Sequence, residues 1–130
     1  MRFLRNTVIV GGAATALALG VTTQAHAELS GAITSNDSCG WTQFEDLGDH
    51  FYIYDVCKDG RGVRVAWDIE GDGLGWYWRD YTGGYTGYSG PYDLNLDLPE
   101  KKWMHVKVGL VDNGSLVSNT WGYTEEVYTS

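Results

Sequence analysis

Apolar and polar residues alternate along most of the chain after Cys39, and this period of two predicts β-strands. The alternation is clearest where β-branched and aromatic residues are enriched, as in 50–57 and 61–68. We expect strands over 41–46, 50–57, 61–68, 74–81, 92–98 and 102–112, with one or two more in 115–128. Leu94, Leu96 and Leu98 are expected to face inward. In the other strands the alternation groups residues on a shared face: Phe51, Ile53 and Cys57; Val63, Val65 and Trp67; and Met104, Val106, Val108 and Leu110.

Turn signals separate these segments. Asp59-Gly60 predicts a hairpin between 50–57 and 61–68, and Asn113-Gly114 is the strongest hairpin signal in the chain. About seven to eight short strands at even spacing are typical of an all-β fold. We therefore predict an antiparallel β-sandwich of the Ig-like or Greek-key type, with Trp41 and Trp67 in the core between its sheets.

Residues 1–27 have the features of a secretory signal peptide. A basic start with Arg2 and Arg5 precedes an apolar run over 8–21, and Ala25-His26-Ala27 fits the small-x-small cleavage pattern. The apolar run is shorter than the roughly 20 residues that a membrane-spanning helix needs. We expect a secreted, extracellular protein without a membrane span, with a flexible N-terminus over 28–38 and a single domain over 39–130.

The net charge limits the classes of partner that the protein can bind, and the number and spacing of the cysteines indicate their role. The formal net charge is −8, and removing Arg2 and Arg5 with the signal peptide makes the chain still more acidic. An acidic surface disfavours nucleic acid and suits a basic protein, cations or neutral sugars. Cys39 and Cys57 lack a C-x-x-C spacing, and in an oxidising compartment they are expected to form one structural disulfide.

The segment 68–92 is the main candidate for function, because aromatic rings and glycines are interleaved along it. Tyr and Trp side chains provide large contact areas at low entropic cost, so an exposed loop of this composition is typical of a binding surface. We expect Tyr81, Tyr85 and Tyr88 to contact a partner, and one of Trp76 and Trp78 to lie in the core.

A second candidate is the N-terminal segment 28–38, which is small and polar with Leu29 and Ile33 as its aliphatic anchors. Such a segment is either a frayed terminus or a strand that becomes ordered by adding to the sheet of a partner. Leu29 and Ile33 are therefore included among the expected partner-binding residues.

The acidic turn at Asp68, Glu70 and Asp72 matches the opening of a calcium loop. Calcium loops also require a bidentate carboxylate at the twelfth position, which is Arg79 in this chain. An acidic hairpin turn is therefore favoured, with calcium binding as the alternative, and no metal ligand is assigned.

Catalytic motifs are incomplete. His50 and His105 have no zinc-ligand spacing, and Ser89 lies in G-Y-S-G-P, which differs from the G-x-S-x-G pattern of hydrolases. The many carboxylates produce close pairs by chance, so they do not indicate a glycosidase. We expect no cofactor and no enzymatic activity.

Several motifs resemble those of a group of small secreted actinomycete proteins. They are S-C-G-W-T over 38–42, the Asp59-Gly60 turn, Y-D-L-N-L-D-L-P-E-K-K-W over 92–103 and V-G-L-V-D-N-G-S-L over 108–116. Within such proteins, the chain is similar to the adaptor subunit of umbrella toxin particles. The resemblance implies a compact β domain that joins a lectin-bearing, protease-like subunit to the large toxin polypeptide, with an N-terminal peptide docked in the partner's cleft.

From these observations we expect a secreted, non-catalytic protein-binding or adaptor protein, and the resemblance implies that it belongs to an extracellular toxin complex. An inhibitor of a secreted hydrolase is one alternative, although 81–91 lacks the cysteine that often braces an inhibitor's reactive loop. A carbohydrate-binding module is the other, because planar rings stack on sugar faces.

Overall fold

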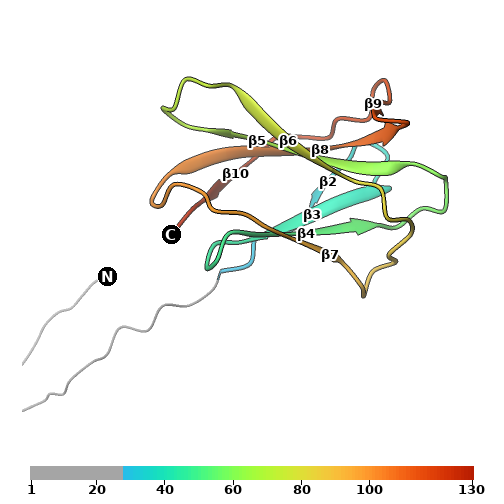
Figure 1. Cartoon of the computed structure of the whole chain (residues 1–130), viewed down its shortest axis with the longest axis horizontal. Coiled ribbons are helices and arrows are strands. Elements are labelled where there is room, and N and C mark those ends of the chain that lie inside the picture. Colours follow the sequence, from blue (N-terminus) through green and yellow to red (C-terminus); the bar gives the residue numbers. More distant parts are fainter. Residues whose placement is uncertain (1–27) are drawn as a thin grey trace, which may run out of the picture.

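The computed structural model describes residues 28–130, which form two antiparallel β-sheets packed face to face (Figure 1). One sheet has the strand order β2-β3-β4-β7, and the other has the order β10-β8-β5-β6, with the short β9 paired to β8. The predicted signal peptide lies outside the described residues, and within them no helix is long and apolar enough to cross a membrane. The strands are β2 (Ile33–Thr34), β3 (Gly40–Glu45), β4 (His50–Asp55), β5 (Gly62–Ile69), β6 (Trp76–Tyr81), β7 (Tyr92–Asn95), β8 (Trp103–Asp112), β9 (Ser115–Leu116) and β10 (Glu125–Tyr128).

The alternation of the sequence determines which side chains fill the space between the sheets. On β3 and β4 the buried residues include Phe44, Phe51 and Ile53, whereas the residues between them face outward. The opposite sheet buries Val63, Val65, Trp67, Met104, Val106, Val108 and Leu110. Removal of this apolar surface from water is the main source of stability. The predicted antiparallel β-sandwich is therefore confirmed.

The hairpin predicted between 50–57 and 61–68 is wrong. β4 pairs with β3 and β7, whereas β5 pairs with β6 and β8 in the opposite sheet. Asp59-Gly60 does turn the chain, but the turn carries it from one sheet to the other. A turn signal sets a local change of direction and does not select the partner of the strand that follows. The β6–β7 and β7–β8 connections also cross between the sheets.

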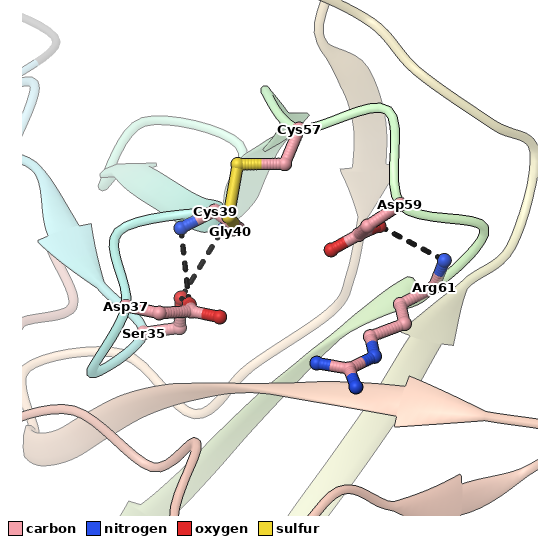
Figure 2. Close-up of a disulfide and its surroundings, with 7 residues drawn as sticks. All are labelled: Ser35, Asp37, Cys39, Gly40, Cys57, Asp59 and Arg61. Atoms are coloured by element: carbon pink, nitrogen blue, oxygen red, sulfur yellow. Dashed lines mark hydrogen bonds between the residues drawn. A yellow bond between two sulfur atoms is a disulfide. The ribbon is translucent and has the colours of Figure 1, made fainter.

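Cys39 and Cys57 form the predicted disulfide, with their α-carbons 5.0 Å apart. The bond joins the two ends of the β3–β4 hairpin (Figure 2). Beside it, Asp37 Oδ1 accepts the N–H of Cys39 and Ser35 Oγ accepts the N–H of Gly40, each over 3.1 Å. These bonds fix the path by which the chain enters β3.

Trp41 lies outside the core, contrary to the prediction, whereas Trp67 is buried as expected. Because Thr42 and Phe44 point inward on β3, the odd-numbered positions of that strand face solvent. Trp41 stacks there on Tyr54 of β4, with the ring centroids 4.0 Å apart and the planes within 10°.

The segment 28–38, expected as a flexible terminus, is instead paired along β3. Ile33 in β2 pairs with Thr42 and is only 2% exposed, so it is a core residue. Leu29 forms an isolated bridge with Glu45 and stays half exposed. The strand addition that the sequence suggested toward a partner occurs within the chain's own sheet.

An irregular segment over 117–123 closes one side of the sandwich. Asn36, just after β2, donates its backbone N–H to the carbonyl of Thr120 over 2.9 Å. Gly122 donates its backbone N–H to the carbonyl of Val108 on β8 over 3.0 Å. The segment therefore contacts both sheets and links the edge strand β2 to the five-stranded sheet.

Candidate functional site

The two tryptophans of β6 project from the outer face of the five-stranded sheet. Tyr77 lies between them and points inward, where its ring stacks on buried Trp67 with the centroids 5.9 Å apart. Trp76 and Trp78 are consequently 37% and 53% exposed. The expectation that one of them lies in the core is wrong, because it is Tyr77 that packs on Trp67.

Cationic side chains from neighbouring strands cover these rings. Lys107 of β8 places its Nζ 4.3 Å from the ring centroid of Trp76 and 4.4 Å from that of Trp121. The guanidinium of Arg64 on β5 lies 5.3 Å from the ring centroid of Trp78. Each contact is an electrostatic attraction between a cation and the electron-rich face of a ring. We call these five residues, Arg64, Trp76, Trp78, Lys107 and Trp121, the tryptophan face.

Two further contacts hold the tryptophan face in place. Arg64 donates to both carboxylate oxygens of Asp80, from Nε over 2.7 Å and from Nη2 over 2.9 Å. This hydrogen bonding raises the pKa of Arg64 above its usual value, so the side chain keeps its charge. Trp121 lies on Gly109 of β8, where an added Cβ would be 3.0 Å from the indole. Glycine at that position therefore lets the indole approach the sheet.

The outer face of the four-stranded sheet carries a second aromatic group, formed by Trp41, Tyr54 and Tyr88. The stacked pair of Trp41 and Tyr54 lies on β3 and β4, and the ring of Tyr88 is 6.2 Å from that of Trp41. Tyr88 is 71% exposed. We call these residues the tyrosine cluster. The strands β3 and β4, which carry Trp41 and Tyr54, and the strands β5, β6 and β8, which carry most of the tryptophan face, belong to opposite layers of the sandwich (Figure 1).

The structure does not bring Tyr81, Tyr85 and Tyr88 together, although the sequence singled them out as one binding loop. Tyr81 is half-buried and stacks on Tyr92, with the centroids 5.0 Å apart. Tyr85 lies under the ammonium of Lys58, at 4.9 Å, and Tyr88 alone joins the tyrosine cluster. The end of β6 and the loop that follows it thus distribute these three rings over three separate neighbours.

Hydrogen bonds to the end of β4 anchor this loop. The backbone N–H groups of Thr86 and Gly87 both donate to the carbonyl of Asp55, over 2.8 and 3.1 Å. The hydroxyl of Thr86 accepts the N–H of Asp55 over 2.8 Å. Tyr85 and Tyr88 therefore extend from an anchored stretch of chain.

A cavity of about 540 Å³ lies beside the disulfide, between the connections that follow β4, β6 and β8. Its lining includes Lys58, Arg61, Tyr85 and Asp112, together with Asp55, which is only 3% exposed. Burial raises the pKa of the Asp55 carboxyl, and the described residues offer it no salt bridge. Figure 2 shows Arg61 in this region, with its backbone N–H donated to Asp59. The cavity offers both signs of charge to a polar ligand.

In the acidic turn between β5 and β6, Asp72 accepts local hydrogen bonds. Asp72 accepts the backbone N–H of Leu74 over 3.0 Å and the hydroxyl of Tyr77 over 2.9 Å. Within residues 28–130, no three His, Cys, Asp or Glu side chains gather closely enough to hold a metal ion. These contacts support the interpretation of 68–73 as a structural turn.

Each of the two histidines after residue 27 lies next to a carboxylate on an outer sheet face. His50 Nδ1 is 2.6 Å from Asp93 Oδ1, and His105 Nε2 is 3.2 Å from Glu126 Oε2. Both pairs join neighbouring strands, so they hold together the outer surfaces that carry the aromatic groups.

Comparison with protein-family models, with curated proteins and with solved structures found no match. Sequence reasoning missed three members of the tryptophan face: Arg64, Lys107 and Trp121. Arg64 and Lys107 occupy the polar positions of alternating strands, which predicts outward side chains but not their proximity to Trp76 or Trp78. Trp121 lies in an irregular segment whose local pattern gave no signal.

Proposed function

We propose that this protein is a secreted, non-catalytic binding protein that connects partner proteins in an extracellular complex. The observation that carries the proposal is the presence of aromatic groups on both outer faces, the tryptophan face on one layer and the tyrosine cluster on the other. An adaptor needs two separate contact surfaces, and the presence of an aromatic group on each layer supports such a role. The resemblance to toxin-particle adaptors agrees with this role.

The composition of the tryptophan face favours a protein partner over a sugar. Trp, Tyr and Arg are the residues most enriched among those that dominate the affinity of protein interfaces. Sugar stacking requires an open ring face, whereas Lys107 covers one face each of Trp76 and Trp121.

The N-terminal segment contributes less to this proposal than the sequence suggested. Ile33 is buried in the core and Leu29 is bridged to Glu45. Docking of 28–34 in a partner's cleft would require its release from β3, at the cost of exposing Ile33 to water. The two aromatic groups need no such rearrangement.

The test is capture of partners from the culture supernatant of the producing organism, with chain 28–130 as bait and crosslinking mass spectrometry as the readout. Trp78→Ala should abolish capture of one partner, and the double variant Tyr54→Ala, Tyr88→Ala should abolish capture of another. Tyr123→Ala is the matched control, because Tyr123 is 89% exposed but belongs to neither group. Partners that all three variants retain would refute the proposal, as would binding only to a glycan array.

A further inference from the structure

Asp46, the residue after β3, holds the first residue of the described chain. Its Oδ1 accepts the backbone N–H of Glu28 over 2.8 Å. In return, the backbone N–H of Asp46 donates to the carbonyl of Glu28 over 3.2 Å. Asp46 is only 9% exposed, so its carboxylate is largely shielded from water.

The residues that follow Glu28 fix this position further. Leu29 forms a bridge with Glu45, and Ser30 donates its N–H to the carbonyl of Phe44 over 2.8 Å. The hydroxyl of Ser30 accepts the N–H of Phe44, also over 2.8 Å. The nitrogen of Glu28 is therefore directed at Asp46 by an array of backbone contacts.

The cleavage pattern of the sequence places the new N-terminus at this same nitrogen. Ala25-His26-Ala27 is the small-x-small motif, and cleavage after it makes Glu28 the first residue. A signal peptidase adds water across the Ala27–Glu28 bond, so that Ala27 gains a carboxylate and Glu28 an amine. The amine then takes up a proton near neutral pH, because α-amino groups have a pKa of about 7.7 to 8.0.

We propose that Asp46 is the binding site for the α-ammonium group of Glu28, and that signal-peptide cleavage creates an ion pair there that fastens the N-terminal segment to β3. Before cleavage, the nitrogen is a neutral amide with one hydrogen to donate. After cleavage, it is a cation facing a shielded carboxylate, and hydrogen bonds between charged groups are markedly stronger than neutral ones. The inference shares with the proposed function only the export of the protein, and it does not depend on the proposed binding role.

The first experiment compares two chains, one beginning at Glu28 and one at Ala27, each released from a cleavable fusion that leaves no extra residue. The longer chain keeps the amide N–H of Glu28 but moves the charge away. In urea unfolding near neutral pH, the Glu28 chain should have a roughly tenfold smaller unfolding constant. Asp46→Asn should reduce this advantage to near zero. Equal unfolding constants for the two unsubstituted chains would overturn the proposal.

A second comparison leaves Asp46 unchanged, since Asp46→Asn can weaken folding by itself. Acetylation of the α-amino group of the Glu28 chain retains an N–H donor and removes the charge. The acetylated chain should unfold like the Ala27 chain, and equality with the free amine would contradict the ion pair. Mass spectrometry of the exported protein should find Glu28 as its first residue, and any other start would also overturn the proposal.

Discussion

Gly122 lies so close to Thr34 that a Cβ added to the glycine would be only 1.8 Å from the carbonyl oxygen of Thr34. Gly122 belongs to the irregular segment 117–123, and Thr34 belongs to β2, the edge strand of the four-stranded sheet. The absence of a side chain at residue 122 is what allows the two backbones to meet. This contact closes the side of the sandwich next to β2.

Gly122→Ala should therefore destabilise the fold strongly. The clash is with backbone atoms on a paired strand, which cannot move away without breaking the β2–β3 pairing. We expect a loss of more than about 3 kcal/mol in the free energy of unfolding, measured by urea denaturation. Gly31→Ala is the matched control, because a Cβ there meets nothing within 4 Å, and it should be nearly neutral. Similar stabilities for the two variants would contradict the close approach.

Replacing both cysteines by serine should lower stability through the unfolded state. The Cys39–Cys57 disulfide spans 18 residues of sequence, and closing a loop of this size stabilises the fold by about 3 kcal/mol. A domain of this size then loses roughly 12–24 °C in its unfolding midpoint. Thermal unfolding followed by circular dichroism, compared with the chemically reduced wild type, checks this. Unchanged midpoints in both samples would show that the bond does not stabilise the domain.

If the tryptophan face binds a partner, as proposed, Trp78→Ala should weaken that binding without unfolding the protein. Aromatic residues at the centre of interfaces typically contribute more than about 2 kcal/mol, which corresponds to a loss of roughly 30-fold in affinity. Because Trp78 is 53% exposed, its removal should cost less than about 1 kcal/mol of folding stability. Titration calorimetry with the captured partner, with Tyr123→Ala as control, tests both statements. Equal affinities of the wild type and Trp78→Ala for the partner would show that Trp78 is not part of the binding surface.

Alkaline titration should identify Tyr52 as a late-ionising tyrosine. Its hydroxyl donates to Glu45 Oε1 over 2.7 Å, and this bond, with smaller contributions from burial and nearby charges, raises its pKa from 10.0 to about 12. The unfolded chain loses this proton earlier, so the stabilising contribution is complete below pH 10 and is lost as the pH rises through 12. Glu45→Ala should lower this pKa, as seen by tyrosinate absorbance. Asp72→Ala is the control, since it removes the partner of Tyr77 instead.

Asp55→Asn should not destabilise the protein at neutral pH, although Asp55 is buried. Burial raises the pKa of its carboxyl above 3.8, against the opposing effect of the Cys57 amide. The folded state thus favours the protonated acid, so its contribution to stability is present below the unfolded pKa and is lost as the pH rises. Relative to wild type, the variant should gain stability at pH 7, and the gain should disappear near pH 3. A loss at pH 7 would show that the hydrogen bond from the Cys57 amide outweighs the effect of burial.

Strand positions and the division of each strand into two faces were largely predictable, because alternation and turn chemistry are local properties of the chain. On β8, Met104, Val106 and Val108 share one face, as the alternation indicated, and that face is the buried one. Asn113 and Gly114 form the predicted hairpin to β9, with positive φ angles of 50° and 81°. Asn and Gly tolerate this conformation, which is why the signal is specific.

Strand partners and the choice of face were not predictable from the same patterns. Alternation divides β6 into two sets of residues, but both sets contain aromatic rings, so nothing local shows that Tyr77 points inward and Trp76 outward. The same ambiguity explains why Trp41 was wrongly predicted to lie in the core. The tryptophan face depends on pairing of β5 with β6 and β8, which brings Arg64 and Lys107 toward the indoles. Such pairing results from the packing of the whole domain.

The central pairing of β5 with β8 has a consequence for the folding rate. It joins Gly62 to Val111 and Ile69 to Met104, so each rung of this ladder closes a long loop of intervening chain. Closing such loops lowers the entropy of the chain before the stabilising contacts have formed. Sandwiches of this kind therefore fold slowly, in roughly milliseconds to seconds. The β3–β4 hairpin, by contrast, joins neighbouring segments and already carries the disulfide. We expect the hairpin to form first and the five-stranded sheet to assemble later, once β8 pairs with β5.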